Sequence, residues 1–123
     1  MKVKPITLTC ADGRRLPLTI GRTYEVLGIE ADYYRLLSDE NHQPVGNDPV
    51  LCAPEYFEIV NSIEPEFWNC RYGEEGERYC YPLTLAQPGF FEDFHDGVLE
   101  AKREFWNAVR KYYPDTWNER MGK

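Results

Sequence analysis

Apolar and polar residues alternate in two short segments near the start of the chain, ITLTC at residues 6–10 and LPLTI at residues 16–20. A period of two is typical of a strand with one buried face. Asp12-Gly13 between the segments indicates a turn. A loop with an odd number of residues sets residue 10 opposite 16, 8 opposite 18 and 6 opposite 20, with every apolar side chain on one face. The pattern therefore predicts a hairpin with an odd loop.

Further short strands follow at regular spacing. We expect strands at residues 24–29 and 33–37, separated by a turn at residues 30–32. A polar loop at residues 38–49 then leads to a short strand at 50–52, a single helical turn at 54–56 and a last strand at 58–60. Five or six short strands separated by turns within about 60 residues are typical of a small β-barrel.

Three of these segments resemble the Src-homology-three-like barrel family. They are LTIGRTYEV at residues 18–26, YYRL at 33–36 and PEYFEIV at 54–60, and they follow the order of that family's diverging turn, aromatic strand and terminal proline–tyrosine turn. The resemblance covers about half the chain and implies a small barrel over residues 1–60. The first strand, ITLTC, lacks the aromatic motif that builds the family's groove for proline-rich peptides, so peptide binding by that groove is not implied.

The second half of the chain predicts a hairpin, a loop and one helix. Residues 69–72 and 78–81 flank GEEG, which favours a hairpin turn, and residues 82–89 predict a loop. Over residues 96–113 apolar residues recur with helical spacing, with Asp96 as the expected N-cap and Pro114 as the stop before a tail at 114–123. The predicted buried face consists of Val98, Ala101, Phe105, Ala108, Val109 and Tyr112.

A stripe of Leu99, Trp106 and Tyr113 continues this face at one edge, and two interpretations stay open for it. Either the helix is buried over half its circumference, or the stripe is a partly exposed binding surface. In both cases the fold class is α+β, mainly β, in a single domain of residues 1–123. The barrel covers residues 1–60, the hairpin and loops 61–95, the helix 96–113 and the tail 114–123, and the packing of 61–95 on the barrel is open.

Negative charge is concentrated in the middle of the chain. The net charge is −7, yet residues 55–100 alone carry eleven acidic residues against Arg71 and Arg78, whereas residues 101–123 are basic. Nucleic-acid binding by charge neutralisation needs clustered lysine and arginine, so it is disfavoured. A basic protein is the natural partner of such a block, and ordinary solubility is the alternative explanation.

The N-terminal segment and the cysteines favour a cytoplasmic protein. MKVKPITLTC lacks the apolar run of a signal peptide, and no later stretch approaches a membrane span. Cys10 and Cys52 fit apolar strand patterns, and Cys70 and Cys80 flank the predicted hairpin, where they could be neighbours. Because no close cysteine pair suggests a zinc site, reduced structural thiols are the expected state.

The segment FFEDFHD at residues 90–96 is the most unusual in the chain. A metal site there would use His95 with neighbouring carboxylates, but no second histidine lies at helical or hairpin spacing. Aromatic anchors followed by a helix cap explain the segment better. A cysteine nucleophile would need Cys70 or Cys80 beside a histidine, and the spacing does not favour that arrangement. The sequence therefore predicts no enzyme and no cofactor.

The leading hypothesis is a non-enzymatic, acidic protein-binding domain. Its size, its charge and the style of the segment PGFFEDFHDG resemble bacterial immunity proteins, which implies tight binding of a basic toxin or effector. The predicted charged ring is Glu64, Glu66, Glu74, Glu75, Glu77, Glu92, Asp93 and Asp96, with Trp68, Phe91 and Trp106 as apolar anchors. The alternatives are a phage-type acidic nucleic-acid mimic and a small metal-dependent enzyme centred on His95. Membrane binding is not expected, and the oligomeric state is not determined.

Overall fold

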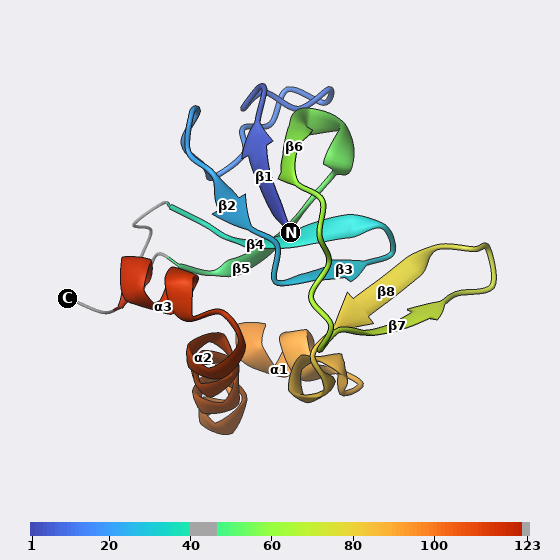
Figure 1. The fold of residues 1–123 in the computed structure, drawn as a ribbon, viewed down its shortest axis with the longest axis vertical. Coiled ribbons are helices and arrows are strands. Elements are labelled where there is room, and N and C mark those ends of the chain that lie inside the picture. The colour runs from blue at the N-terminus through green and yellow to red at the C-terminus, as the bar shows by residue number, and fades with distance from the viewer. Residues whose placement is uncertain (40–46, 122–123) are drawn as a thin grey trace.

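The centre of the molecule is a five-stranded antiparallel sheet that is packed on both faces. The computed structural model describes residues 1–39 and 47–121 (Figure 1). The large sheet has the order β5-β4-β3-β8-β7, and a three-stranded sheet of order β2-β1-β6 lies on one side of it, with the helices on the other.

The strands are β1 (Lys2–Pro5), β2 (Tyr24–Glu25), β3 (Gly28–Glu30), β4 (Tyr33–Leu37), β5 (Pro49–Cys52), β6 (Phe57–Asn61), β7 (Asn69–Tyr72) and β8 (Arg78–Tyr81). The helices are α1 (Phe90–His95), α2 (Leu99–Tyr112) and α3 (Pro114–Arg120), with 3-10 turns η1 (Pro54–Tyr56) and η2 (Leu83–Ala86).

Strand β4 shows the two-sided packing most clearly. Four successive residues, Tyr34 to Leu37, are buried. Tyr34 and Leu36 belong to the core beneath the small sheet, whereas Leu37 belongs to the core formed with the helices. Because successive side chains of a strand point to opposite faces, the large sheet separates two apolar cores. For this reason four successive residues of the strand are buried, and buried and exposed residues do not alternate along it.

The first strand differs from the predicted one. It is β1, at Lys2–Pro5, and the predicted strands at 6–10 and 16–20 meet only through a bridge between Thr9 and Arg15. The odd loop is confirmed, but the register is two residues tighter than predicted, since the Leu16 N–H donates to Leu8 O at 2.7 Å. Pairing with β6 continues to Ile6, whose N–H donates to Tyr56 O, and this directs the following residues away from a long hairpin.

The strands of the described residues form two open sheets, so the closed barrel expected over residues 1–60 is not seen. The predicted strand at 24–29 is divided: β2 pairs with β1, whereas β3 pairs with β4 and β8. Strand β8 lies beyond residue 60, so the large sheet crosses the expected boundary. The strands predicted at 33–37, 50–52 and 58–60, the turn at 54–56 and the hairpin at 69–72 and 78–81 are confirmed. Residues 40–46 of the predicted loop lie outside the described residues.

Three helices follow where one was predicted. Helix α2 begins at Leu99, not at residue 96, because Asp96 is the C-cap of the unpredicted helix α1 and Gly97 adopts the left-handed conformation (φ 83°) that ends it. Pro114 ends α2 as expected, but it also starts α3 in place of the predicted tail. Within residues 1–39 and 47–121, no helix has the length and apolarity needed to cross a membrane.

The predicted buried face of α2 is confirmed for Ala101, Phe105, Ala108 and Val109. Val98 precedes the helix and is 42% exposed. The edge stripe changes character along its length: Leu99 is 76% exposed, Tyr113 is fully buried, and Trp106 is half-buried with its ring 6.4 Å from that of Trp117 in α3. The stripe is thus core at one end and surface at the other.

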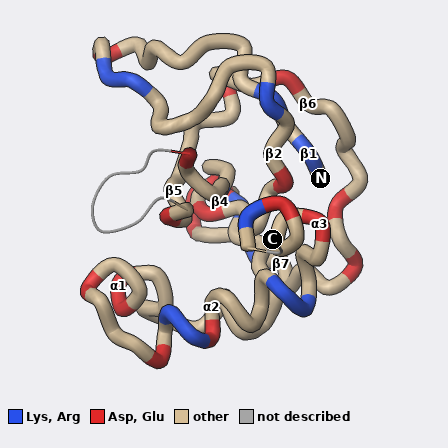
Figure 2. The backbone as a smooth tube through the Cα atoms, turned by 90° about the vertical axis from the view of Figure 1, so that its left-hand side faces the viewer, with Lys and Arg blue, Asp and Glu red and all other residues tan. Residues whose placement is uncertain are grey.

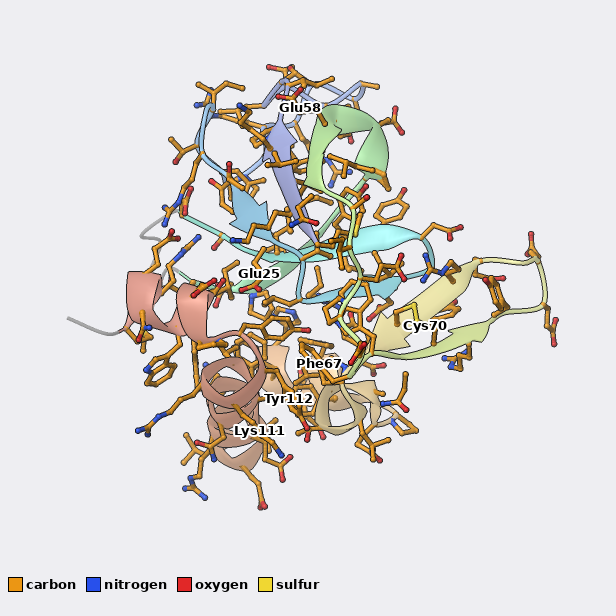
Figure 3. The ribbon with its side chains drawn as sticks, viewed as in Figure 1. Glu25, Glu58, Phe67, Cys70, Lys111 and Tyr112 are labelled. Atoms are coloured by element: carbon orange, nitrogen blue, oxygen red, sulfur yellow. A yellow bond between two sulfur atoms is a disulfide. The ribbon has the colours of Figure 1, made fainter. Side chains whose placement is uncertain are left out.

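The hydroxyl of Tyr113 joins three parts of the chain inside the molecule. It donates to Leu27 O at 2.7 Å and accepts from Trp68 Nε1 at 2.8 Å. Burial raises the pKa of Tyr113 well above its usual range. Phe67 packs beside it, 4.8 Å from the ring of Tyr112 (Figure 3). These contacts fix the segment after β6 against the end of α2. They show how residues 61–68 pack, which the sequence left open.

A second polar cluster, centred on Asp39, fixes α3 to the N-terminal half. The carboxylate accepts from the hydroxyls of Thr19 and Tyr24 and pairs with Arg22 at 2.7 Å and with Arg120 at 2.9 Å. Arg120 also donates to Ser38 O at 2.7 Å. Burial, followed by the hydrogen bond to Asp39, raises the pKa of Tyr24 to about 12. Helix α3 is therefore an integral part of the fold.

Replacing Tyr113 by Phe should destabilise the protein by about 1–3 kcal/mol, because Leu27 O and Trp68 Nε1 would stay buried without a partner. Urea unfolding followed by tryptophan fluorescence measures the loss. Tyr112→Phe is the matched control, since the neighbouring hydroxyl makes no hydrogen bond to a described residue, and it should change the free energy of unfolding by less than about 0.5 kcal/mol. Equal effects of the two variants would contradict the role given to Tyr113.

Stability should fall as the pH rises above 10. The pKa of Tyr24 is raised from 10.0 to about 12 in the folded state, so between these values the unfolded chain releases a proton that the folded chain keeps. The free energy of unfolding therefore decreases with pH, by at most about 1.4 kcal/mol per pH unit from this one group. Urea unfolding of the wild type and Tyr24→Phe from pH 8 to 11.5 should show a shallower decline for the variant. Parallel curves would refute the assignment.

Candidate partner-binding site

A cavity of about 390 Å³ lies between the β7–β8 hairpin and the segment that leads from η2 into α1. It is lined by Glu30, Asn69, Cys70, Arg71, Tyr79, Tyr81, Leu85, Ala86, Gln87, Pro88, Gly89, Phe90, Phe91 and Glu92. Aromatic rings and aliphatic groups make up much of the wall, and carboxylate, guanidinium and amide groups are placed among them, as is usual for a ligand-binding cavity. A second cavity, of about 400 Å³, lies between residues 10–16 and η1 and contains no residue of the predicted site.

One wall of the cavity follows from the register of the hairpin. Asn69 lies opposite Tyr81 and Arg71 lies opposite Tyr79, so these four residues share one face of the two strands. The Arg71 guanidinium lies over the Tyr79 ring, 4.2 Å from its centroid. Cys70 and Cys80 form the pair between them and point to the opposite face. The hairpin thus has a cavity face and a disulfide face.

The floor of the cavity is a charged network behind the aromatic surface. The Arg35 side chain, 5% exposed, donates to Tyr81 Oη at 3.0 Å, to Glu30 Oε1 at 2.9 Å and to Pro49 O at 3.0 Å. Its guanidinium lies 3.9 Å from the centroid of the Phe91 ring. The Tyr81 hydroxyl donates to the same Glu30 oxygen at 2.8 Å, and burial raises the pKa of Tyr81. Arg35 is therefore satisfied inside the protein, as a buried charge requires.

Glu30 has a carboxylate oxygen, Oε2, that this network does not use. Both of its hydrogen bonds within the described part of the chain are made by Oε1. The side chain is 34% exposed and lines the cavity. Oε2 can therefore accept a hydrogen bond from a ligand without disturbing the bonds to Arg35 and Tyr81.

Gly28 allows the Tyr81 ring to reach this position. A Cβ at residue 28 would lie 2.2 Å from Cδ1 and Cε1 of the Tyr81 ring and 2.8 Å from Cys80 O. Strands β3 and β8 are paired at the next residue, Ile29 opposite Cys80, so neither strand can move aside independently. The glycine is required here for close approach and not for a turn.

The structure distributes the eight predicted carboxylates over three places. Glu64 and Glu66 lie between β6 and β7, the residues Glu74, Glu75 and Glu77 lie at the turn of the hairpin, and Glu92, Asp93 and Asp96 lie on α1 and just after it. Glu64 alone among them forms an ion pair with a described basic residue, Arg78 at 2.7 Å, and this hydrogen bond lowers the pKa of the Glu64 carboxyl. Figure 2 shows acidic positions around α1.

We call Glu74, Glu75, Glu77, Glu92 and Asp93 the acidic margin, because they lie on the two elements that form the walls of the cavity. Glu74, Glu75, Glu92 and Asp93 are exposed, whereas Glu77 is partly buried and its Oε1 accepts from the Glu75 N–H at 2.9 Å. Of the eight predicted carboxylates, Glu92 alone lines the cavity, and Glu64 and Glu66 precede the hairpin and lie on neither of the two elements.

Two of the three predicted apolar anchors are parts of the cores. Trp68 and Phe91 are each only 8% exposed: Trp68 bonds to Tyr113, and Phe91 packs on Arg35 and Phe105. Trp106 is half-buried against α3. Trp68 and Phe91 thus stabilise the fold instead of presenting a surface to a partner. The interpretation of FFEDFHD as aromatic anchors is confirmed by the burial of Phe90, Phe91 and Phe94.

The expectation of reduced thiols is confirmed for Cys10 and Cys52 and is wrong for Cys70 and Cys80. Cys70 and Cys80 form a disulfide, because their directly opposed positions on β7 and β8 place the Cα atoms 4.1 Å apart (Figure 3). Glu64 lies beside the two sulfur atoms, and in the described part of the chain this is the one group of three potential metal ligands, which does not include His95. The sulfurs are bonded to each other, so neither is a thiolate ligand. Burial raises the pKa of the Cys52 thiol to about 12, which makes it unreactive at neutral pH.

Sequence reasoning missed the residues that form the cavity floor, Glu30, Arg35 and Tyr81. A signal for Arg35 was present, because an arginine in the run YYRLL is the one charged residue in an otherwise apolar strand. A charge in such a strand must find buried partners. The partners themselves lie on β3 and β8, and no local pattern connects them.

No protein-family model matches the chain, and neither does any curated protein or solved structure.

Arg35→Met should destabilise the protein by about 2–4 kcal/mol, because Glu30 and the Tyr81 hydroxyl would lose their charged partner in a largely buried site. Arg71→Met is the matched control: it removes an arginine that also lies over an aromatic ring, but at an exposed position in the cavity wall, and should cost less than about 1 kcal/mol. Both free energies can be measured by urea unfolding with the disulfide intact. A larger loss for Arg71→Met would overturn this account of the floor.

Proposed function

We propose that the chain is a non-enzymatic protein-binding domain of the immunity or inhibitor type, which neutralises a basic toxin or effector protein. The proposal depends mainly on the cavity between the hairpin and α1, with carboxylates in its wall and along both flanking elements. A basic side chain of the partner would enter the cavity, and the acidic margin would face the surrounding basic surface.

Charge supports a basic partner. None of the five residues of the acidic margin is paired with a lysine or arginine of the described chain within 4.0 Å. Carboxylates that have no internal partner keep their full charge for an approaching molecule, and like charges close together repel wrong partners that are acidic. Their arrangement speeds association more than it adds affinity, so contacts inside the cavity must supply most of the affinity.

The cavity chemistry supports an arginine or lysine as the inserted side chain. Glu30 Oε2 can accept a hydrogen bond at the floor, and Glu92 stands at the wall. The rings of Tyr79 and Phe90 also line the cavity. A cation between carboxylates and aromatic faces is stabilised by both, and the protein's own Arg71 over the Tyr79 ring illustrates the aromatic contribution. Anchors of this kind, seated in a pocket, contribute most of the affinity of many interfaces.

Neutralising three carboxylates of the acidic margin tests the proposal. The immobilised chain should retain a basic protein from its native host at about 0.05 M salt and release it by about 0.5 M, and a complex of defined stoichiometry should be recovered by size exclusion. The variant Glu74→Gln/Glu75→Gln/Glu92→Gln should bind that protein about tenfold more weakly. The matched control, Asp48→Asn/Glu55→Gln/Glu104→Gln, removes equal charge elsewhere and should weaken binding less than threefold, by the same reasoning.

Three results would count against the proposal. Equal weakening by both triple variants would show a diffuse charge effect and no specific site. Displacement of the bound protein by duplex DNA would favour the nucleic-acid mimic instead. A stoichiometric metal in the purified protein, found by elemental analysis, would favour the metal-dependent enzyme.

A further inference from the structure

The Cys70–Cys80 disulfide is unequally accessible at its two ends. Cys70 lies on β7, the edge strand of the large sheet, and is exposed. Cys80 lies on the neighbouring strand β8 and is fully buried in the core beneath the small sheet. A thiolate from solution can therefore reach Cys70 Sγ, whereas Cys80 Sγ is shielded. In thiol–disulfide exchange the accessible sulfur is attacked and the other sulfur leaves.

A guanidinium is placed next to the sulfur that would leave. Arg78 Nη2 lies 3.0 Å from Cys80 Sγ and 3.6 Å from Cys70 Sγ. Glu64 accepts two hydrogen bonds from the same guanidinium, at 2.7 and 2.9 Å. The positive charge of the N-terminal ammonium also lowers the pKa of Glu64. Glu64 offsets part of the positive charge but fixes the guanidinium at the sulfurs. A cation at this distance stabilises a thiolate and makes it a better leaving group.

We propose that Cys70–Cys80 is a thiol–disulfide exchange site that accepts a dithiol reductant. The reductant's thiolate attacks Cys70 Sγ, a bond forms between these sulfurs, the Cys70–Cys80 bond breaks, and its electron pair leaves on Cys80 Sγ beside Arg78. The second thiol of the reductant then attacks the mixed disulfide and releases Cys70. The reductant becomes a cyclic disulfide, and its two electrons and two protons pass to the two cysteines.

Reduction loosens one wall of the cavity. Strand β7 pairs with β8 alone, so in the reduced protein it is held in the sheet by its backbone ladder and side-chain packing without a covalent link. Asn69 and Arg71 lie on the cavity face of this strand. The redox state of the disulfide face therefore controls the order of the cavity face. The further statement, that the redox state also controls the affinity for a partner, rests on the proposed function.

The exchange is tested on the whole protein under native conditions, without any partner. Dithiothreitol is added at neutral pH, samples are quenched with an alkylating reagent at intervals, and labelled cysteines are identified by peptide mass spectrometry. We expect Cys70 to become labelled, while Cys80 and Cys52, which are both buried, stay protected. In Cys80→Ser, oxidised glutathione should modify Cys70, whereas in Cys70→Ser it should leave Cys80 unmodified in the folded protein.

The role of Arg78 has its own controls. Arg78→Gln should slow reduction about three- to tenfold, because the leaving thiolate loses its cation. Arg78→Lys keeps a positive charge and should restore most of the rate, and Arg103→Gln, at an exposed position on α2, should leave it unchanged. Circular dichroism identifies variants that have lost the fold. On reduction, amide hydrogen exchange should rise at residues 69–72 and stay constant in α2.

Reduction that occurs only together with labelling of Cys52, or only in denaturant, would overturn the proposal and make the disulfide purely structural. Equal rates for Arg78→Gln and the wild type would remove Arg78 from the mechanism. These outcomes are independent of any partner, so they differ from a failure of the proposed function, which would appear as absent or site-insensitive retention of a basic protein. If exchange occurs and the partner binds both redox forms equally, control of binding is refuted while the exchange site stands.

Discussion

Burial of the large sheet on both faces is the constraint on which the rest of the structure depends. In β3, β4 and β8 the core beneath the small sheet takes Ile29, Tyr34, Leu36 and Cys80, and the core beneath the helices takes Leu37 and Tyr81. A strand in this position cannot hold a charged residue unless that charge is paired internally, and Arg35 meets the requirement through Glu30, Tyr81 and Pro49 O. Gly28 is needed for the same reason, since a side chain there would collide with Tyr81.

This constraint also produces the candidate site. The β7–β8 hairpin adds the last two strands to the large sheet, and the chain then returns through η2 and α1 to cover the helical face. The cavity is the space between the hairpin and this return. The network that neutralises Arg35 therefore becomes the floor of a cavity, and one carboxylate, Glu30, serves both the core and the surface. Core and candidate site cannot be altered independently here.

The elements that sequence reasoning predicted well are those defined by neighbours along the chain. The odd loop at residues 10–14, the turn at Pro54–Tyr56, the hairpin at 69–81 and the buried face of α2 each follow from a local period or turn sequence. The predictions are wrong where pairing or packing with a distant segment outweighs the local sequence pattern. Residues 24–29 carry one strand pattern but divide between two sheets, because β8 pairs with β3. Trp68 and Phe91 are predicted from the sequence as apolar anchors for a partner, yet both side chains are buried in the cores.

Three features follow from the amino-acid sequence without knowledge of the fold: the mainly β character of the chain, the amphipathic helix and the excess of carboxylates between residues 55 and 100. Periodicity and charge are properties of neighbouring residues and need no knowledge of the fold. Three other features are visible only in the folded chain: which carboxylates line a cavity, which aromatic rings are buried, and the bond between Cys70 and Cys80 beside the guanidinium of Arg78. These features depend on strand pairing between residues far apart in the chain, and the free energy of that pairing comes from the two cores together, not from any single segment.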